Sequence, residues 1–179
     1  MLKVIKGPDL RLRVATRSIK KITPGLISTT KEMIKLTKTF QDPEGVGLAS
    51  TQVGLDGSFF VGLSEEPQKN QKIKFEAFLN PKIISTSKKT QTRFEGCLSI
   101  PNYWGEVKRH TYIKVSYQDI SGKIIAKTLT GLMAHIFQHE VDHLNGVLFP
   151  DLVLSQKGKF YKWTGKDETG QDVFEEITV

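Results

Sequence analysis

The sequence predicts an α+β fold in which short antiparallel or mixed strands pack around a central metal-binding helix. Three observations support this: two amphipathic helical segments, several short alternating segments separated by turn residues, and two histidines four residues apart on the second helix. The chain has 179 residues, which suits one domain with its own core. We therefore expect residues 1–179 to form a single catalytic domain, with an atypical C-terminal tail over residues 151–179.

Two helices are expected. The first begins at Thr23-Pro24, because threonine is a good N-cap and proline fits the first turn, and it runs to Phe40. The second spans about residues 130–144 and ends at Asn145-Gly146, a left-handed exit. Its mostly apolar segment, residues 132–137, indicates that this helix is buried.

Short strands are expected at residues 58–63, 72–79, 82–85, 112–118 and 123–129. The last two form a hairpin, because Ile113, Val115 and Tyr117 alternate before a turn at residues 119–122. Glycines in the tail oppose a long terminal helix, so a covering hairpin or strand is expected there, with residues 174–179 strand-like.

Charge and composition exclude several classes of protein. The net charge is +7, but the basic residues come as scattered pairs, which favours a mixed-charge surface over a specific nucleic-acid site. Transient contact with a polyanion such as the ribosome fits this charge. The single cysteine excludes an internal disulfide, and no segment resembles a membrane helix or a signal peptide. We therefore expect a cytoplasmic protein without membrane contact.

The strongest chemical signal is His139-Glu140-Val141-Asp142-His143. Histidines four apart on a helix can offer two imidazoles to one metal ion, while Glu140 lies beside them to move protons. A catalytic metal usually takes three protein ligands. A lone cysteine is more often a small buried side chain, but the glycine before Cys97 and the turn after it make Cys97 a candidate third ligand.

Three blocks of this sequence resemble the peptide deformylase family, in the family's order. They are Gly45-Val46-Gly47-Leu48-Ala49-Ser50-Thr51-Gln52, Glu95-Gly96-Cys97-Leu98-Ser99 and Gln138-His139-Glu140-Val141-Asp142-His143-Leu144. The resemblance covers about residues 4–153 and implies a peptide deformylase-like fold. It also implies an enzyme that removes the formyl group from the formyl-methionine of N-formylated nascent peptides.

On the matching positions, the resemblance implies that Cys97, His139 and His143 hold one divalent metal ion and that Glu140 is the general base. Family members generally use iron(II) physiologically and often carry zinc or nickel after purification. We therefore expect iron(II) in the cell, with zinc, nickel or cobalt possible in the purified protein.

The resemblance also implies how the substrate is held. The side-chain amide of Gln52 and the backbone N–H of Leu98 would stabilise the oxyanion. Backbone groups near Val46, Gly47 and Gly96 would pair with an extended peptide.

Two positions depart from the family pattern. His135, one turn before His139, stands where an apolar residue usually lines the methionine pocket, to which Leu132 also belongs. It is either a neutral histidine bonded to nearby backbone or a polar pocket residue that relaxes the methionine preference. Trp104 replaces an arginine found near the cleft in many members, and we favour a packed loop anchor over a cleft aromatic.

Arg109 matches a family arginine, and Glu95 and Asp142 match family acids. We expect Arg109 to pair with one of these acids and support the ligand segment, the alternative being an ordinary exposed basic residue beside Lys108. Two other functions share part of this pattern. A peptide-bond metalloprotease shares the two-histidine helix but lacks the Cys97 block, and a ribosome-associated module with little activity would not need every ligand and the base.

Overall fold

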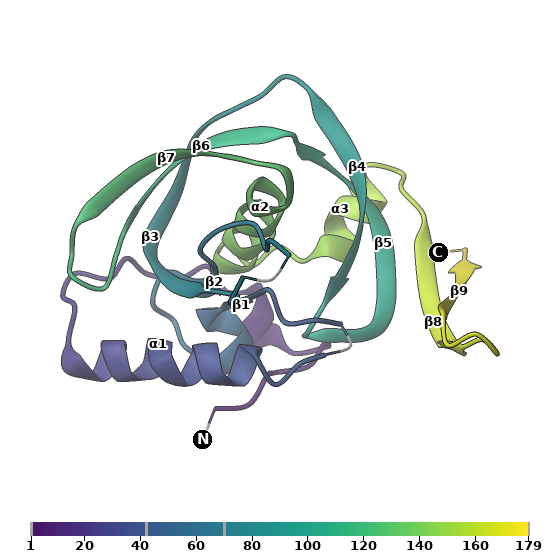
Figure 1. The fold of residues 1–179 in the computed structure, drawn as a ribbon, viewed down its shortest axis with the longest axis horizontal. Helices are drawn as coiled ribbons and strands as arrows, with labels where there is room; N and C mark the ends of the chain where they lie inside the picture. Colours follow the sequence, from purple (N-terminus) through teal and green to yellow (C-terminus); the bar gives the residue numbers. More distant parts are fainter. Residues whose placement is uncertain (1, 42, 70, 179) are drawn as a thin grey trace.

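The structure is a computed structural model that describes residues 2–41, 43–69 and 71–178. Helix α2 (Gly131–Leu144) lies at the centre, with strands of two antiparallel sheets around it (Figure 1). The first sheet has the order β1 (Gly47–Ala49), β2 (Phe59–Leu63), β3 (Phe75–Thr86), β6 (Tyr112–Gln118), β7 (Ile124–Thr130). The second has the order β4 (Thr90–Cys97), β5 (Ile100–His110), β8 (Phe160–Lys166), β9 (Asp172–Ile177). This arrangement confirms the α+β prediction.

Helix α1 (Pro24–Thr37) begins where the sequence predicts. The Thr23 hydroxyl accepts a hydrogen bond from the Leu26 N–H at 3.2 Å, and Pro24 occupies the first turn. The helix ends at Thr37 rather than Phe40, and Met33 packs against Leu48 and the rest of one face of the first sheet.

The expected hairpin is present as β6 and β7, but the two strands expected over residues 72–79 and 82–85 are one strand, β3. The prediction of two strands was wrong because Asn80-Pro81 forms a bulge inside β3 instead of a break. Asn80 has a φ of 48°, and the pairing with β6 shifts between Leu79 and Lys82. The Asn80 side chain bonds the Ile19 main chain at 2.7 and 2.9 Å and so holds the bulge in place.

Strands β4 and β5 and helix α3 (Phe149–Ser155) were not predicted. The sequence of β4 is mostly polar with a glycine near its end, and its first three residues are exposed, so it lacks the apolar alternation that reveals a strand. The covering hairpin expected in the tail is present as β8 and β9, and β8 pairs with β5. Val179, the end of the expected last strand, lies outside the described residues.

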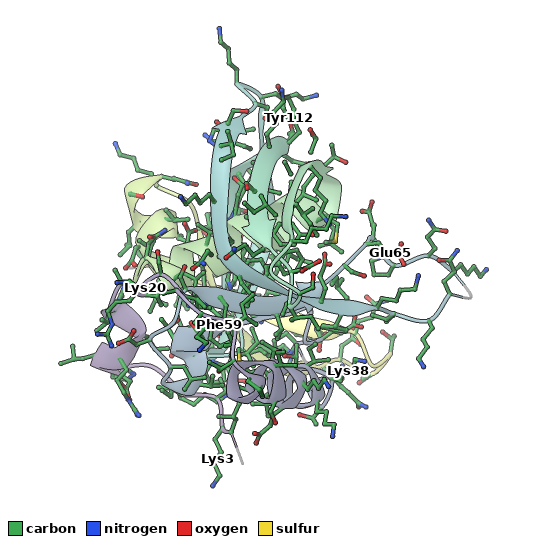
Figure 2. All side chains as sticks on the ribbon, turned by 90° about the vertical axis from the view of Figure 1, so that its left-hand side faces the viewer. Lys3, Lys20, Lys38, Phe59, Glu65 and Tyr112 are labelled. Carbon is green, nitrogen blue, oxygen red and sulfur yellow. The ribbon has the colours of Figure 1, made fainter. Side chains whose placement is uncertain are left out.

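Three apolar clusters make up the core of the described residues. One joins α2 to the first sheet, one joins α1 to the other face of that sheet, and one joins α3 to the second sheet. Phe59 lies inside, whereas Lys3, Lys20 and Lys38 lie at the periphery (Figure 2). Of the helices in the described residues, none combines the length and the apolar character needed to cross a membrane.

Candidate active site

A cavity of about 180 Å³ opens beside α2, between β1 at one edge of the first sheet and β4 at one edge of the second. Both sheets therefore present an edge strand to the same space. The cavity is lined by Val46, Gly47, Gln52, Phe94, Glu95, Gly96, Cys97, Leu98, Trp104, Leu132, His135, Ile136, His139 and Glu140. Most of the residues that the sequence singles out thus lie around one space.

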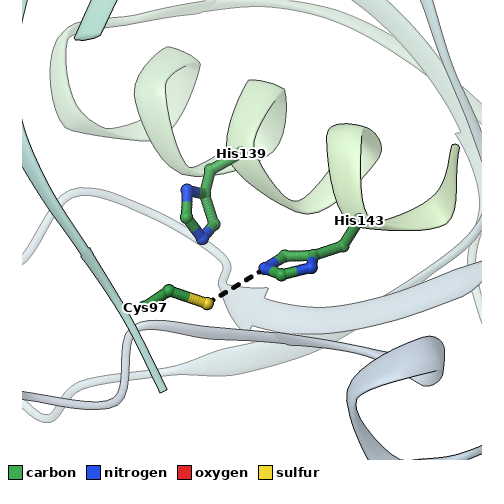
Figure 3. Close-up of side chains that lie close together, drawn as sticks. All are labelled: Cys97, His139 and His143. Carbon is green, nitrogen blue, oxygen red and sulfur yellow. Dashed lines mark hydrogen bonds between the residues drawn. The ribbon is translucent and has the colours of Figure 1, made fainter. Parts of the chain in front are cut away.

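Three side chains converge next to this cavity. His139 and His143 lie one turn apart on α2, and their rings point towards Cys97 at the end of β4 (Figure 3). The Cys97 Sγ lies 3.2 Å from the His143 Nε2, and the ligand atoms of the three residues lie within 4.8 Å of one another. The structure therefore brings together one sulfur and two nitrogen donors from two separate elements.

The surroundings of these donors fit a metal ion. The His139 Nδ1 bonds the Glu95 carboxylate at 2.9 Å, which leaves the other ring nitrogen as the ligand. The Ser99 N–H and the Gln52 amide reach the Cys97 Sγ at 3.4 and 3.5 Å, and such donors stabilise a thiolate. Three ligands of this kind are typical of a catalytic divalent metal site.

Glu140 is buried beside the histidines. Its Oε2 has no hydrogen-bond partner among the described residues, and burial raises the pKa of Glu140 to about 7. Gly47 makes room for this carboxylate, because a Cβ at that position would lie 2.9 Å from the Glu140 Cδ. A carboxyl group that titrates near neutral pH suits general-base catalysis.

Gln52 is held in one orientation. Its Oε1 accepts the Ala49 N–H at 2.8 Å, so its amide nitrogen points to Cys97 and also donates to the Ser99 hydroxyl at 3.2 Å. Leu98 lies in the turn between β4 and β5, and its carbonyl accepts a hydrogen bond from the Lys6 ammonium at 2.6 Å. The sequence reasoning missed Lys6 and Ser99. Ser99 stood within a motif block, but nothing in the sequence linked Lys6 to Leu98.

Arg109 connects two elements of the site. It pairs with Glu95 at 2.6 and 3.0 Å and with Asp142 on α2 at 2.6 Å, so it contacts both expected acids rather than one. Burial alone would raise the pKa of Glu95, but the hydrogen bonds from His139 and Arg109 outweigh it and hold that pKa well below 4.5. Arg109 is itself buried, unlike an ordinary surface base.

His135 and Leu132 line the cavity wall. The His135 Nε2 lies 3.3 Å from the Glu95 carboxylate, and its Nδ1 is buried without a hydrogen-bond partner among the described residues. Burial lowers the pKa of His135 to about 4, so the ring is neutral at pH 7. The neighbour of His135 is therefore a carboxylate rather than the backbone group that one of the two interpretations expects.

Trp104 lies in the cavity wall on β5, so its interpretation as a packed loop anchor was wrong. The position is a strand because β5 pairs with β4 on one side and β8 on the other, a pairing that the sequence did not reveal. Phe94, which stacks on Trp104, is a second cavity residue that the sequence reasoning missed.

Comparisons with known proteins agree with this geometry. A family model described as polypeptide deformylase matches residues 1–159. The peptide deformylase of Desulfotalea psychrophila is 37% identical over 162 residues, which cover 90% of this chain and 93% of that protein. The crystal structures of a probable peptide deformylase from Synechococcus phage S-SSM7 and of peptide deformylase from Thermotoga maritima have TM-scores of 0.77 and 0.75. Their sequences are 33% and 35% identical to this chain, respectively. Each match covers 85% of this chain, and it covers 99% of the phage protein and 97% of the Thermotoga protein.

Proposed function

The chain belongs to the peptide deformylase family of metal-dependent enzymes, and we propose that it removes the formyl group from nascent peptides in the cavity beside α2. One observation carries the assignment of this site. Cys97, His139 and His143 converge within 4.8 Å of one another, with the buried carboxylate of Glu140 beside them. These three residues would hold the metal ion.

A divalent metal ion at these ligands would supply the Lewis acidity that lowers the pKa of a water molecule towards neutrality. Glu140 accepts the proton of the attacking water and passes it to the amine that leaves. Its pKa of about 7 supports both steps, because a group that titrates near the working pH can accept and return a proton.

The oxyanion and the peptide are held by groups on the two edge strands and the adjoining turns. The Gln52 amide and the Leu98 N–H stabilise the oxyanion, and the fixed orientation of Gln52 towards Cys97 supports its part. Val46, Gly47 and Gly96 offer backbone groups to an extended peptide. The position of β1 and β4 at sheet edges supports this pairing, because edge strands retain free N–H and C=O groups.

The metal that we propose for the cell is iron(II), with zinc, nickel or cobalt able to replace it in the purified protein. The donor set of one thiolate and two imidazoles accepts all four metals, so the ligands do not discriminate among them. Anaerobic purification followed by elemental analysis tests this. A protein purified without air that holds zinc and no iron contradicts the iron assignment.

The decisive experiment measures formate release from formyl-Met-Ala-Ala by the metal-loaded protein. Glu140→Gln keeps the size of the side chain but removes the base, so its rate is expected to fall by about 10²–10⁴-fold with the metal content unchanged. Glu168→Gln, an exposed residue of the tail, is the control and retains the wild-type rate. Substantial activity in metal-loaded Glu140→Gln would remove Glu140 from the role of base.

Transient ribosome contact in the cytoplasm is the remaining part of the proposal. The net charge of +7 supports it, and scattered exposed lysines such as Lys3 and Lys20 suit weak, salt-sensitive contact. Cosedimentation with ribosomes in 50 mM and 300 mM salt tests it: we expect binding only in low salt, and no cosedimentation in either contradicts the contact.

A further inference from the structure

Aromatic side chains form a continuous strip on one face of the second sheet, starting at the cavity. Trp104 stacks on Phe94 with ring centroids 5.2 Å apart and planes 9° apart. Phe174 packs edge-on against both rings, at 5.0 and 5.6 Å, and Tyr161 packs against Phe94 at 5.2 Å. These four residues, from all four strands, are called the aromatic strip below.

The strand register explains why these rings share a face. Gly96 lies opposite Trp104, and Trp104 lies opposite Tyr161, so side chains at these positions point the same way. Part of the opposite face is buried, since Val107 and Phe160 on that face pack against α3. The aromatic strip is therefore the outward face, and 42% of the surface of Phe94 is exposed.

Gly96 lies where the aromatic strip meets the cavity. A Cβ at Gly96 would lie 2.9 Å from the Trp104 ring, so this ring lies directly over the glycine backbone. An extended peptide that pairs with the β4 edge at Gly96 places alternate side chains on this same face. Such a side chain meets Phe94 and Trp104. A second cavity of about 80 Å³ shares Trp104 with the first and is also lined by Trp163 of β8.

The C-terminal hairpin, formed by β8 and β9, also contacts Trp104. Strand β8 begins at Phe160, directly after the residues that match the family model, and the hairpin lies outside β5 (Figure 1). It contributes Tyr161 and Phe174 to the strip and Trp163 to the second cavity. The segment that follows the family-like part of the chain thus completes an aromatic surface next to the active-site cavity.

We propose that Trp104, held between Phe94 and Phe174, binds an apolar or aromatic side chain that follows the methionine of the formylated peptide. This proposal rests on the function proposed above and names a preference of the same site. A well-packed ring contact corresponds to about a three- to tenfold gain in kcat/KM. The enzyme is therefore selective beyond the first residue of its substrate.

Three peptides test the proposal: formyl-Met-Ala-Ala, formyl-Met-Phe-Ala and formyl-Met-Ala-Phe. For the wild type, kcat/KM is expected to be about three to ten times higher for one of the phenylalanine peptides than for the alanine peptide. Trp104→Ala brings this ratio close to one, whereas Trp104→Phe retains part of it. Tyr103→Ala is the matched control, because Tyr103 directly precedes Trp104 on β5, is 40% exposed and points to the opposite face. It keeps the wild-type ratio.

A fluorescence titration measures the same contact without turnover. The chain has two tryptophans, so Trp163→Phe leaves Trp104 as the single tryptophan fluorophore. Its emission is expected to change more with Met-Phe-Ala or Met-Ala-Phe than with Met-Ala-Ala. Equal kcat/KM for the three peptides in the wild type, or an unchanged ratio in Trp104→Ala, overturns the proposal. If the enzyme releases no formate from any of the three formylated peptides, the proposed function is contradicted instead. The fluorescence titration then tests the binding of the side chain to Trp104 on its own.

Discussion

Gly47 determines where the Glu140 carboxylate can lie. A methyl group at this position would meet the Glu140 Cδ at 2.9 Å, and the buried strand leaves the backbone little room to retreat. Gly47→Ala is therefore expected to displace Glu140 and lower kcat by about 10²-fold, because misplacing a catalytic group by about 1 Å has effects of this size. Steady-state kinetics of the metal-loaded variant measure the loss.

Gly25→Ala is the control for that substitution. Gly25 is exposed in the first turn of α1, where a Cβ would find its nearest neighbour at an ordinary 3.7 Å. This variant keeps the wild-type kcat. A Gly47→Ala variant with full activity and normal metal content would show that Glu140 is not confined by Gly47.

His135 gives the cavity a polar wall. Its Nδ1 is buried and lacks a partner among the described residues. It can therefore form a hydrogen bond with a polar side chain at the first residue of the substrate peptide. We expect the wild type to deformylate formyl-Gln and formyl-Met peptides with a smaller difference in kcat/KM than His135→Ile. Formyl-norleucine peptides separate size from polarity. A strict methionine preference that His135→Ile leaves unchanged would refute a role of His135 in specificity.

At the scale of elements, Arg109 links β5 to β4 through Glu95 and to α2 through Asp142. Removing it leaves a buried carboxylate without its countercharge, which typically costs about 3–5 kcal/mol. Arg109→Ala is therefore expected to lower the free energy of unfolding by this amount and the metal affinity by about 10–100-fold. Urea unfolding and metal titration measure the two effects.

Lys108→Ala is the matched control for Arg109→Ala. Lys108 is the preceding residue on β5 and its side chain is exposed, so both quantities remain at wild-type values. If Arg109→Ala also leaves stability and metal affinity unchanged, Arg109 does not support the ligand segment.

Asp151 ties the start of α3 to the N-terminal segment by accepting hydrogen bonds from Arg13 and from the Leu148 N–H. Burial alone would raise the pKa of Asp151, but these bonds outweigh it and lower the pKa below 3.8. A lowered pKa adds stability above about pH 3.8 that disappears as the pH falls further. Asp151→Asn is therefore expected to be less stable than the wild type at pH 6, by at most about 1 kcal/mol. The difference shrinks at pH 3, and an equal difference at both pH values contradicts the assignment.

The elements that the sequence predicts well are those with local signals. Thr23-Pro24 marks the start of α1, and the alternation in residues 112–118 marks β6, because capping and periodicity act over a few residues. The place of Trp104 in the cavity could not be predicted in this way. It depends on the pairing of β5 with β4 and β8, and strand pairing between distant segments leaves no local pattern.

At the scale of the whole molecule, the site shows the same difference between local sequence signals and contacts between distant segments. Two histidines one turn apart need only the helical period to meet, so His139 and His143 could be paired from the sequence. Cys97 is 46 residues from His143, so no helical period links the two. The glycine before it and the turn after it made Cys97 only a candidate ligand, and the resemblance to a family then implied its place in the set. Lys6, 92 residues from Leu98, lacked both kinds of signal and was found only in the structure.

The proposed metal ligands lie beside residues of all three apolar clusters, and this placement predicts how the whole chain unfolds. Cys97 belongs to the cluster of α3, and the adjacent Leu98 belongs to the cluster of α1. Helix α2, which carries both histidines, contributes its apolar side chains to the third cluster. Because one site uses residues that lie next to different clusters, we expect residues 1–179 to unfold cooperatively as one domain. Calorimetry should therefore give one transition, and a metal at 100 times its Kd should raise Tm by about 5–10 °C. Chelation or Cys97→Ser removes this rise, whereas two separate transitions in the metal-loaded protein contradict the single domain.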